Sequence, residues 1–309
     1  MAKKKEVEQE GMNRLNRIAP KTNVIFNVIF VLCSLICILP VIFVFMISIT
    51  SEETLKRYGY SFIPKEFSLG AYRFLLGEGE TILRALGVSL FVTIVGTIIG
   101  IILTTTMGYV LSRPNYKLKG FLTMVVFIPM IFNGGMIASY VVNTNMLGLK
   151  NSVWALIWPL AVSSFNIIIC KTFFRTTIPD SIIESAKIDG AAQLSIFTRI
   201  VLPISKPVIA TIGLFLTFGY WNDWFQSSLY INTDKLYSLQ ALLNSILQNI
   251  QALAKNPAMG VTLQQYKNAM PQEGARMAIA IIIIVPIACA YPFFQKYFIS
   301  GLTIGAVKG

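Results

Sequence analysis

The chain has 309 residues, of which 55% are hydrophobic and only 13% are charged, and its mean hydropathy is +0.66. Soluble domains carry about 25% charged residues, so this composition excludes an ordinary soluble protein and indicates one mostly embedded in lipid. The net charge of +12 is also found in nucleic-acid-binding proteins. In a membrane protein, however, it follows from the excess of Lys and Arg on cytoplasmic loops, so we predict no nucleic-acid partner.

The chain begins with a polar, basic segment, residues 1–22, and continues into an apolar run at residues 24–49. This run is too long for the core of a signal peptide, and no small-residue cleavage site follows it. We therefore predict an uncleaved first membrane-spanning helix. Five further apolar segments have about the 17–25 residues that a spanning helix needs. They cover residues 85–111, 121–142, 153–173, 203–220 and 277–294.

The second and third spans carry glycines that predict local structure. Gly96 and Gly100 are four residues apart in the second span, a spacing of small residues that allows close helix packing. Asn133, Gly134 and Gly135 lie inside the third span, where exposed backbone is costly and needs a reason. Either the helix breaks there to line a water-filled cavity, or the glycines serve ordinary tight packing.

Six spans place both termini on one side of the membrane, and the distribution of charge indicates which side. The four segments that share that side carry sixteen of the 26 cations: six at the N-terminus, three after the second span, five after the fourth and two at the C-terminus. The positive side is cytoplasmic, so we predict that both termini are cytoplasmic. Two long loops, about 50–84 and 221–276, are then external. Residues 234–249 of the second loop have helical spacing, which predicts an interfacial helix or a surface helix packed on the bundle.

Several chemical groups are missing from this sequence. It has no His, and its four Cys all fall in apolar runs without metal-ligand spacing, so we predict no metal site and no cofactor. The apolar body of each span lacks the ionisable residue that ion-driven carriers keep there. The chain also lacks the phosphate-binding Gly-x-x-x-x-Gly-Lys-Ser/Thr pattern and any catalytic constellation. We therefore predict that it is not an enzyme and that its energy source lies in another protein.

The longest polar, helix-competent segment, about residues 176–205, lies between the fourth and fifth spans. Ser181 and Glu184 have the spacing of a capping box, which predicts that Ser181 caps a helix. Gly190 offers a bend because glycine tolerates positive φ. Pro203 suits the start of the next helix. We predict two short helices joined by a bend, covalently continuous with the membrane domain.

This segment resembles the signature loop of the permease subunits of ATP-binding-cassette importers. The family pattern is Glu-Ala-Ala, three residues, Gly, nine residues, Ile, one residue and Leu-Pro. Every spacing is kept here, in residues 184–186, Gly190, Ile200 and residues 202–203, and only Ser185 departs from the pattern. In the family this loop docks into a groove of the ATPase subunit. The resemblance implies that the ATPase-coupling residues are Glu184, Ser185, Ala186, Lys187, Asp189, Gly190, Ala191 and Arg199.

Four further segments resemble the carbohydrate-uptake branch of this family, and within it the complex polysaccharide or aldouronate oligosaccharide subgroup. They are residues 132–137, 146–149, 154–157 and 297–309. The resemblance implies an all-α, polytopic membrane fold with six transmembrane helices and a cytoplasmic coupling-helix loop. It divides the chain into a cytoplasmic segment 1–22, a permease domain 23–296 and a cytoplasmic tail 297–309.

The same resemblance implies that the chain works by alternating access in a bacterial cell (inner) membrane. Its partners would be a second permease subunit in a heterodimer, two ATPase domains that bind ATP and Mg, an extracellular or periplasmic sugar-binding protein, the oligosaccharide and the lipid bilayer. Two alternatives stay open: the same architecture importing a peptide or polyamine, and a non-transport membrane scaffold for an ATPase.

Aromatic and amide side chains gather at the end of the fifth span. Aromatics at such a position usually form an interfacial belt. They also suit sugars, because the apolar faces of sugar rings stack on aromatic planes while sugar hydroxyls need amide or carboxylate partners. Together with the glycine-containing break, they form the candidate substrate path: Asn133, Gly134, Gly135, Tyr140, Tyr220, Trp221, Asn222, Asp223 and Trp224.

Overall fold

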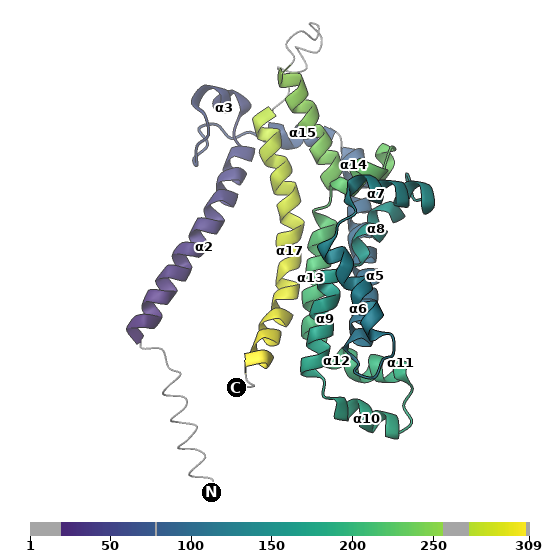
Figure 1. The fold of residues 1–309 in the computed structure, drawn as a ribbon. Coiled ribbons are helices and arrows are strands. Elements are labelled where there is room, and N and C mark those ends of the chain that lie inside the picture. The colour runs from purple at the N-terminus through teal and green to yellow at the C-terminus, as the bar shows by residue number, and fades with distance from the viewer. Residues whose placement is uncertain (1–19, 78, 256–271, 307–309) are drawn as a thin grey trace. The chain divides into compact units, whose positions relative to one another are not determined.

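The computed structural model describes residues 20–77, 79–255 and 272–306 (Figure 1). These residues are almost entirely helical, with one isolated β-bridge between Thr50 and Phe67, so the all-α prediction is confirmed. The chain divides into two compact units, which we describe separately. The first comprises Met1–Ala71 and Pro271–Ile281, and the second comprises Tyr72–Met270 and Ile282–Gly309.

The first unit begins with α2 (Pro20–Ser48), which is the first predicted span. Its 29 residues extend about 44 Å at the usual rise of about 1.5 Å per residue, more than enough to cross a bilayer. The most apolar stretch of α2 has no buried residue. The exposed apolar side chains of this stretch therefore suit contact with the hydrocarbon of a lipid bilayer.

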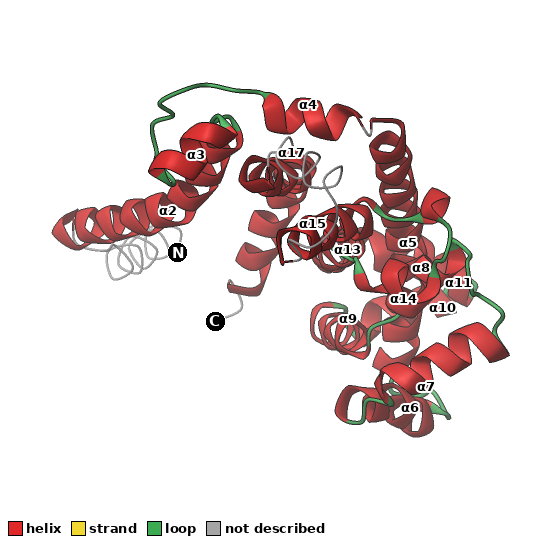
Figure 2. Ribbon diagram, turned by 90° about the horizontal axis from the view of Figure 1, so that it is seen from above, coloured by secondary structure: helices red, strands yellow, loops and turns green. Residues whose placement is uncertain are grey.

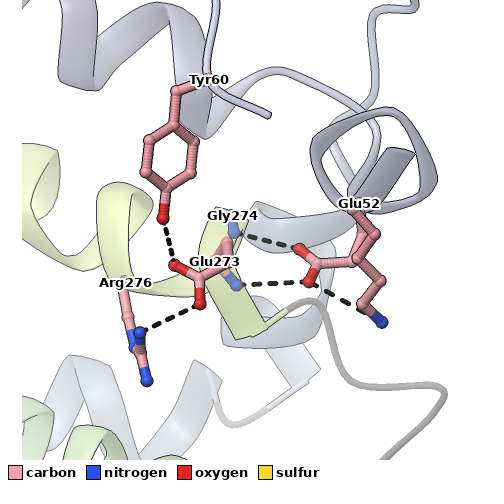
Figure 3. A network of polar contacts seen from close by, with 6 residues as sticks. Glu52, Tyr60, Glu273, Gly274 and Arg276 are labelled. Atoms are coloured by element: carbon pink, nitrogen blue, oxygen red, sulfur yellow. Dashed lines mark hydrogen bonds and ion pairs between the residues drawn. The ribbon is translucent and has the colours of Figure 1, made fainter. Parts of the chain in front are cut away.

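The short helix α3 (Glu52–Tyr58) is joined to the start of α17 (Gln272–Ala306) by a polar network (Figure 3). The Glu52 carboxylate accepts hydrogen bonds from the backbone N–H groups of Glu273, at 3.3 Å, and Gly274, at 3.1 Å. The first N–H groups of a helix have no partner within the helix, so a carboxylate from elsewhere both pairs them and favours the positive end of the helix dipole. Glu52 thus caps α17 across more than 200 residues of sequence.

Glu273 itself is held by two further side chains in this network. The Tyr60 hydroxyl donates to its carboxylate over 2.6 Å, and Arg276 pairs with its other oxygen at 3.0 Å. The hydrogen bond to Glu273 raises the pKa of the Tyr60 hydroxyl above its ordinary value, because the carboxylate stabilises the protonated hydroxyl. This part of the predicted external loop is therefore ordered by specific contacts.

The second unit is built around α5 (Gly79–Ser112), which packs against α8, α9 and α13 (Figure 2). Its other described elements, in chain order, are α4 (Gly70–Gly77, which begins in the first unit), α6 (Lys119–Ile131), α7 (Gly135–Val141), the π-helical turn η1 (Val142–Met146), α8 (Trp154–Ala161), α9 (Ser164–Thr177), α10 (Asp180–Ile188), α11 (Gln193–Ile196), the π-helical turn η2 (Phe197–Val201), α12 (Leu202–Ile204), α13 (Lys206–Trp221), α14 (Phe225–Tyr230), the 3-10 turn η3 (Asp234–Leu236), α15 (Leu239–Lys255) and the remainder of α17.

Glycines on one face of α5 allow its neighbours to approach closely, as their spacing predicts. A Cβ atom added at Gly96 would overlap the ring of Tyr220 on α13. A Cβ at Gly100 would lie 2.8 Å from a methyl group of Leu216, which is also too close. The Tyr220 hydroxyl donates over 2.7 Å to the carbonyl of Ile157 on α8. Contact between α5 and α13 at Gly96 therefore places Tyr220 where it also reaches α8.

The predicted spans are found in the structure in several forms. Within the described residues, three helices are long and apolar enough to cross a membrane, namely Pro20–Ser48, Gly79–Ser112 and Gln272–Pro292. Two further candidates are bent helix pairs, α8 with α9 at 47° and the helical segment Gln193–Ile204 with α13 at 83°. The third predicted span is shorter than expected, because α6 ends at Ile131. The count of six spans stays a prediction.

Of the two alternatives left open for the glycines of the third span, the structure shows the helix break. Phe132 takes an extended conformation after α6, and Gly135 begins α7 with a φ of +80°. In the predicted external loop, the expected helix is also present, and it begins at Leu239, later than expected. The polar segment 1–22 lies largely outside the described residues. The predicted tail 297–309 begins inside α17, which continues to Ala306.

Replacing Gly96 with Ala should lower the free energy of unfolding by about 1–3 kcal/mol, because the new methyl group forces Tyr220 out of its position. Thermal denaturation of the purified chain in detergent measures this loss. Gly87→Ala is the matched control on the same helix, since a Cβ at Gly87 meets no atom within 4 Å. Alanine favours a helix over glycine, so Gly87→Ala should be neutral or slightly stabilising. Equal melting temperatures for the two variants would contradict the packing argument.

Replacing Glu52 with Gln should loosen the start of α17, because a neutral amide is a weaker acceptor than a carboxylate for the N–H groups of Glu273 and Gly274. Hydrogen exchange at these two amides should become about fivefold faster. Glu53→Gln, a change at the neighbouring exposed carboxylate, is the control and should leave the two exchange rates unchanged. Unaltered exchange in Glu52→Gln would mean that the cap adds nothing to local stability.

Candidate coupling segment and substrate path

The candidate coupling segment consists of α10, a turn, α11, η2 and α12, at one end of the second unit (Figure 1). The turn after α10 has the Schellman arrangement of hydrogen bonds. The Ala191 N–H donates to the carbonyl of Ala186 over 2.9 Å, and the Gly190 N–H donates to the carbonyl of Lys187 over 3.0 Å. Gly190 has a φ of +79°, where a side chain would add strain, so the predicted bend at this glycine is confirmed.

The capping box predicted for α10 is wrong. The helix begins at Asp180, with Pro179 at the capping position, and no side chain caps it. Pro179 is extended and its side chain has no hydrogen-bonding group. A helix capped by Ser181 would begin at Ile182, so the observed helix begins two residues earlier than predicted. Asp180 contributes a favourable negative charge to the first turn instead. Ser181 and Glu184 are both exposed.

Burial divides the segment into two faces. Ile183, Ala186 and Ile196 are buried in the same hydrophobic cluster as Tyr220 and Val92, so this face is continuous with the core of the unit. The exposed side chains of the segment include four large apolar ones, of which Ile188 at 86% and Leu194 at 72% are the most exposed. Among the predicted coupling residues, Ala191 is half-buried and six are exposed: Glu184, Ser185, Lys187, Asp189, Gly190 and Arg199.

Arg113, which the sequence did not single out for this site, attaches the segment to the rest of the unit. Its guanidinium pairs with Asp180 of α10 at 3.1 Å and donates to the Ser112 hydroxyl at the end of α5 over 3.0 Å. It also reaches the carbonyl of Phe174 on α9 at 3.5 Å and lies 5.2 Å from the centre of the Tyr109 ring. One side chain thereby links the start of α10 to the ends of α5 and α9.

A cavity of about 330 Å³ lies beside this link, lined among others by Arg113, Tyr116, Glu184, Lys187 and Gln193. Tyr109 and Gln193 also approach each other here, with 3.4 Å between the hydroxyl and the amide oxygen. Both charges of α10 that line the cavity, Glu184 and Lys187, belong to the predicted coupling residues. The cavity therefore opens on the face that the segment leaves exposed.

The residues predicted for a substrate path divide between core and surface. Tyr220 and Trp221 are 3% and 4% exposed, and their polar atoms donate to the backbone carbonyls of Ile157 and Ile283. In this structure these two rings pack in the core, because their only polar atoms are already paired. Asn222 is exposed and donates to the carbonyl of Phe218 over 3.0 Å. Trp224 is exposed and meets Phe225 edge to face at 6.0 Å.

Asp223 follows α13 and is mostly buried. Burial raises the pKa of its carboxyl to about 6, while hydrogen bonds from the backbone N–H groups of Gln226 and Phe225 lower it. The Gln226 N–H lies 3.2 Å from one carboxylate oxygen and 3.4 Å from the other. Asp223 therefore organises the turn between α13 and α14. Among the described residues, no group of three or more His, Cys, Asp or Glu could hold a metal ion.

A second cavity, of about 480 Å³, is lined by only two of the residues predicted for the path, both from the helix break. It is lined by Asn133 and Gly135 from the helix break and by Phe225 and Gln226 from α14. Gly134 is exposed at the same break, and Tyr140 stacks on Tyr230 with 6.0 Å between ring centres. Four polar residues that the sequence analysis missed also line this cavity: Ser139, Asn143, Gln226 and Tyr230. Ser139 and Asn143 lie four and eight residues beyond Gly135 on continuous helical chain, a spacing that a helical projection would have detected. Gln226 and Tyr230 lie on α14, which a turn separates from α13, so no helical spacing indicated them.

Residues 96–304 match the family model described as the inner membrane component of binding-protein-dependent transport systems. The chain is 42% identical over 275 residues to Protein LplC of Bacillus subtilis, covering 89% of this chain and 90% of that protein. It is 40% identical over 277 residues to the polygalacturonan/rhamnogalacturonan transport system permease protein YtcP of the same organism, covering 89% and 94%.

A solved structure is similar as well. It is a chain of a bacterial ABC transporter involved in the import of the acidic polysaccharide alginate, with a TM-score of 0.77 and 25% sequence identity. The similarity covers 92% of this chain and all of the other. The family match begins at Gly96 within α5 and includes the candidate coupling segment and the residues that line both cavities. This chain therefore belongs to the family of inner membrane permease components of binding-protein-dependent transport systems, and it is a multi-pass membrane protein.

Proposed function

We propose that the chain is one of two permease subunits of an ATP-driven importer that takes up oligosaccharides. The observation that carries this proposal is the coupling segment, which has the signature spacing, a glycine-dependent turn and an exposed apolar face. Relatives named for polygalacturonan/rhamnogalacturonan and arabinooligosaccharide transport support a carbohydrate cargo. The partners would be a second permease subunit, two ATPase domains that bind ATP and Mg, and a sugar-binding protein.

In this proposal the exposed face of the coupling segment docks on the ATPase. Ile188 and Leu194 would supply apolar contact, and Lys187 and Arg199 would supply charge. Closure of the ATPase dimer would then move α10. Because Arg113 links Asp180 to the ends of α5 and α9, that displacement reaches the central helix directly. Rotation of the helices that pack on α5 would open the path to the outside. ATP hydrolysis would then return these helices to the arrangement that opens the path to the cytoplasm.

The proposal also includes six spans with both termini in the cytoplasm of a bacterial cell. It makes this chain a non-catalytic subunit whose ATP hydrolysis takes place in its partner. In the second unit, the helices α7 and α14 lie at the end opposite α10 and α11 (Figure 1). If the coupling segment meets the ATPase in the cytoplasm, the cavity near α7 and α14 faces the side from which sugar arrives.

Purification of the chain from native membranes in mild detergent tests this function. A second permease, an ATPase and a sugar-binding protein should be recovered with it. ATP hydrolysis by the recovered complex should rise severalfold when oligosaccharide and binding protein are added together. A peptide or polyamine mixture is the control and should not stimulate hydrolysis. Recovery of the chain without these partners after mild cross-linking, or stimulation by peptide in place of sugar, would contradict the proposal.

Replacing Gly190 with Val should uncouple ATP hydrolysis from transport, because a β-branched residue cannot readily hold a φ of +79° and the turn would be displaced. We expect at least about tenfold less sugar transported per ATP hydrolysed. Gly190→Asn is the matched control, since Asn tolerates the left-handed region and should retain most of the coupling. A Gly190→Val complex that assembles and transports normally would show that this turn is not needed for coupling.

A further inference from the structure

The cavity of about 480 Å³ between α7, η1, α8 and α14 has the dimensions of a ligand site. Pockets that bind small molecules usually measure about 300–1,000 Å³ and place a few polar groups among apolar walls. Here Met136, Pro159 and Leu229 supply apolar surface. Amide and hydroxyl groups come from the helix break on one side and from α14 on the other.

The polar groups of the cavity are uncharged. Among its described lining residues are three amides, a serine hydroxyl and a tyrosine hydroxyl, and no Asp, Glu, Lys or Arg. The Asp223 carboxylate accepts the N–H of Gln226 and so adds negative charge behind one wall. A ligand carboxylate placed here would find no cation among these residues and would be repelled by the nearby charge of Asp223. This wall therefore suits hydroxyl groups and opposes anions.

Existing hydrogen bonds hold two of the amides in fixed orientations. Asn143 donates to the carbonyl of Ser139 over 2.9 Å and to the Tyr230 hydroxyl over 3.0 Å. The side-chain oxygen of Asn133 accepts the N–H of Gly135 over 2.8 Å, which leaves its NH₂ group as the donor for a ligand. These side chains are fixed before any ligand arrives, so little conformational entropy is lost on binding.

Gln226 is different, because its side-chain oxygen is buried and has no hydrogen-bond partner. Buried polar atoms are nearly always paired, and an unpaired one requires an explanation. The terminal torsion of Gln is soft, so a turn of the amide presents either its oxygen or its nitrogen to the cavity. The neighbouring Phe225 ring is 40% exposed and also lines the cavity. An apolar sugar face stacked on Phe225 would bring its hydroxyls toward Gln226.

We propose that this cavity is a subsite for an uncharged sugar ring and that it discriminates against a uronate ring at the same place. The inference rests on the proposed function as an oligosaccharide importer, and it specifies one contact that the imported chain makes. Asn133, Asn143 and Gln226 bind hydroxyl groups, and Phe225 packs on the ring face. Acidic units of a mixed oligosaccharide are accommodated elsewhere.

Ligand-observed saturation-transfer NMR on the full-length chain in detergent tests the subsite. The probes are methyl α-galactopyranoside and methyl α-galacturonopyranoside, which differ only in a hydroxymethyl group against a carboxylate. The galactoside should receive saturation, and the galacturonide should bind at least about tenfold more weakly. Gln226→Leu, which keeps a similar side-chain volume, should weaken galactoside binding about fivefold to tenfold, because one hydrogen-bonding partner is lost.

Gln251→Leu is the matched control, because Gln251 is exposed on α15. This variant should bind both probes as the wild type does. If Gln226→Leu melts at a lower temperature than the control, Ser139→Ala replaces it, with a weakening of about threefold expected. Equal affinity for the two probes, an unaltered affinity in both cavity variants, or no saturation of the galactoside would each overturn the subsite.

Uptake by the assembled complex separates this inference from the function on which it rests. An unchanged KM for a neutral oligosaccharide in Gln226→Leu would refute the subsite and leave the importer intact. Failure of the wild-type complex to take up any oligosaccharide would refute the importer itself.

Discussion

Close contact between α5 and its neighbours is the constraint on which the second unit depends. In lipid, helices gain nothing from hiding apolar surface, so association relies on van der Waals contact at small residues. Gly96 admits the ring of Tyr220, and Gly100 admits Leu216. Gly108 lies further along the same helix, where an added Cβ atom would lie 2.6 Å from the Cβ of Cys170 on α9, too close for any larger residue. These three positions hold α13 and α9 against one helix and thereby define the core.

The same core extends to the coupling segment. Ile183, Ala186 and Ile196 belong to the cluster that contains Tyr220, so a displacement of α10 cannot be confined to the surface. Protein interiors are close-packed and transmit such displacements. Arg113 adds a polar connection at the place where α5, α9 and α10 meet. Apolar packing and one guanidinium together give the segment the mechanical continuity that a coupling element requires.

The two units use different means of holding helix termini. In the first, Glu52 caps a distant helix start, and Tyr60 and Arg276 hold the carboxylate of Glu273. In the second, the end of α10 is satisfied by its own backbone through the turn at Gly190. The first arrangement depends on side-chain charge, whereas the second depends on a conformation that only glycine and a few other residues adopt easily. Substitutions at Glu52 and at Gly190 should therefore destabilise their helix termini for different physical reasons, loss of a charged acceptor in one case and backbone strain in the other.

Local patterns in the sequence were sufficient for several features. Hydropathy identified the apolar helices α2, α5 and α17, because a long apolar run has few alternatives to a helix in lipid. Glycine spacing predicted the contact at Gly96, and the positive φ of Gly190 followed from the bend expected there. The break after Ile131 was one of two alternatives that Asn133 and the two following glycines left open, and the structure decided between them. Such features depend on residues close together in the chain.

Only the tertiary structure decided the remainder, because it depends on residues far apart in the chain. Whether Tyr220 packs in the core or lines a path depends on its reach to Ile157, which no local pattern encodes. Arg113 and Asp180 are 67 residues apart, and Glu52 and Gly274 are 222 apart, so their pairing arises from folding alone. The cap predicted for α10 was wrong because the helix begins at Asp180, two residues before the start that a cap at Ser181 would give. The helix break and α14 form one cavity only because helix packing juxtaposes them.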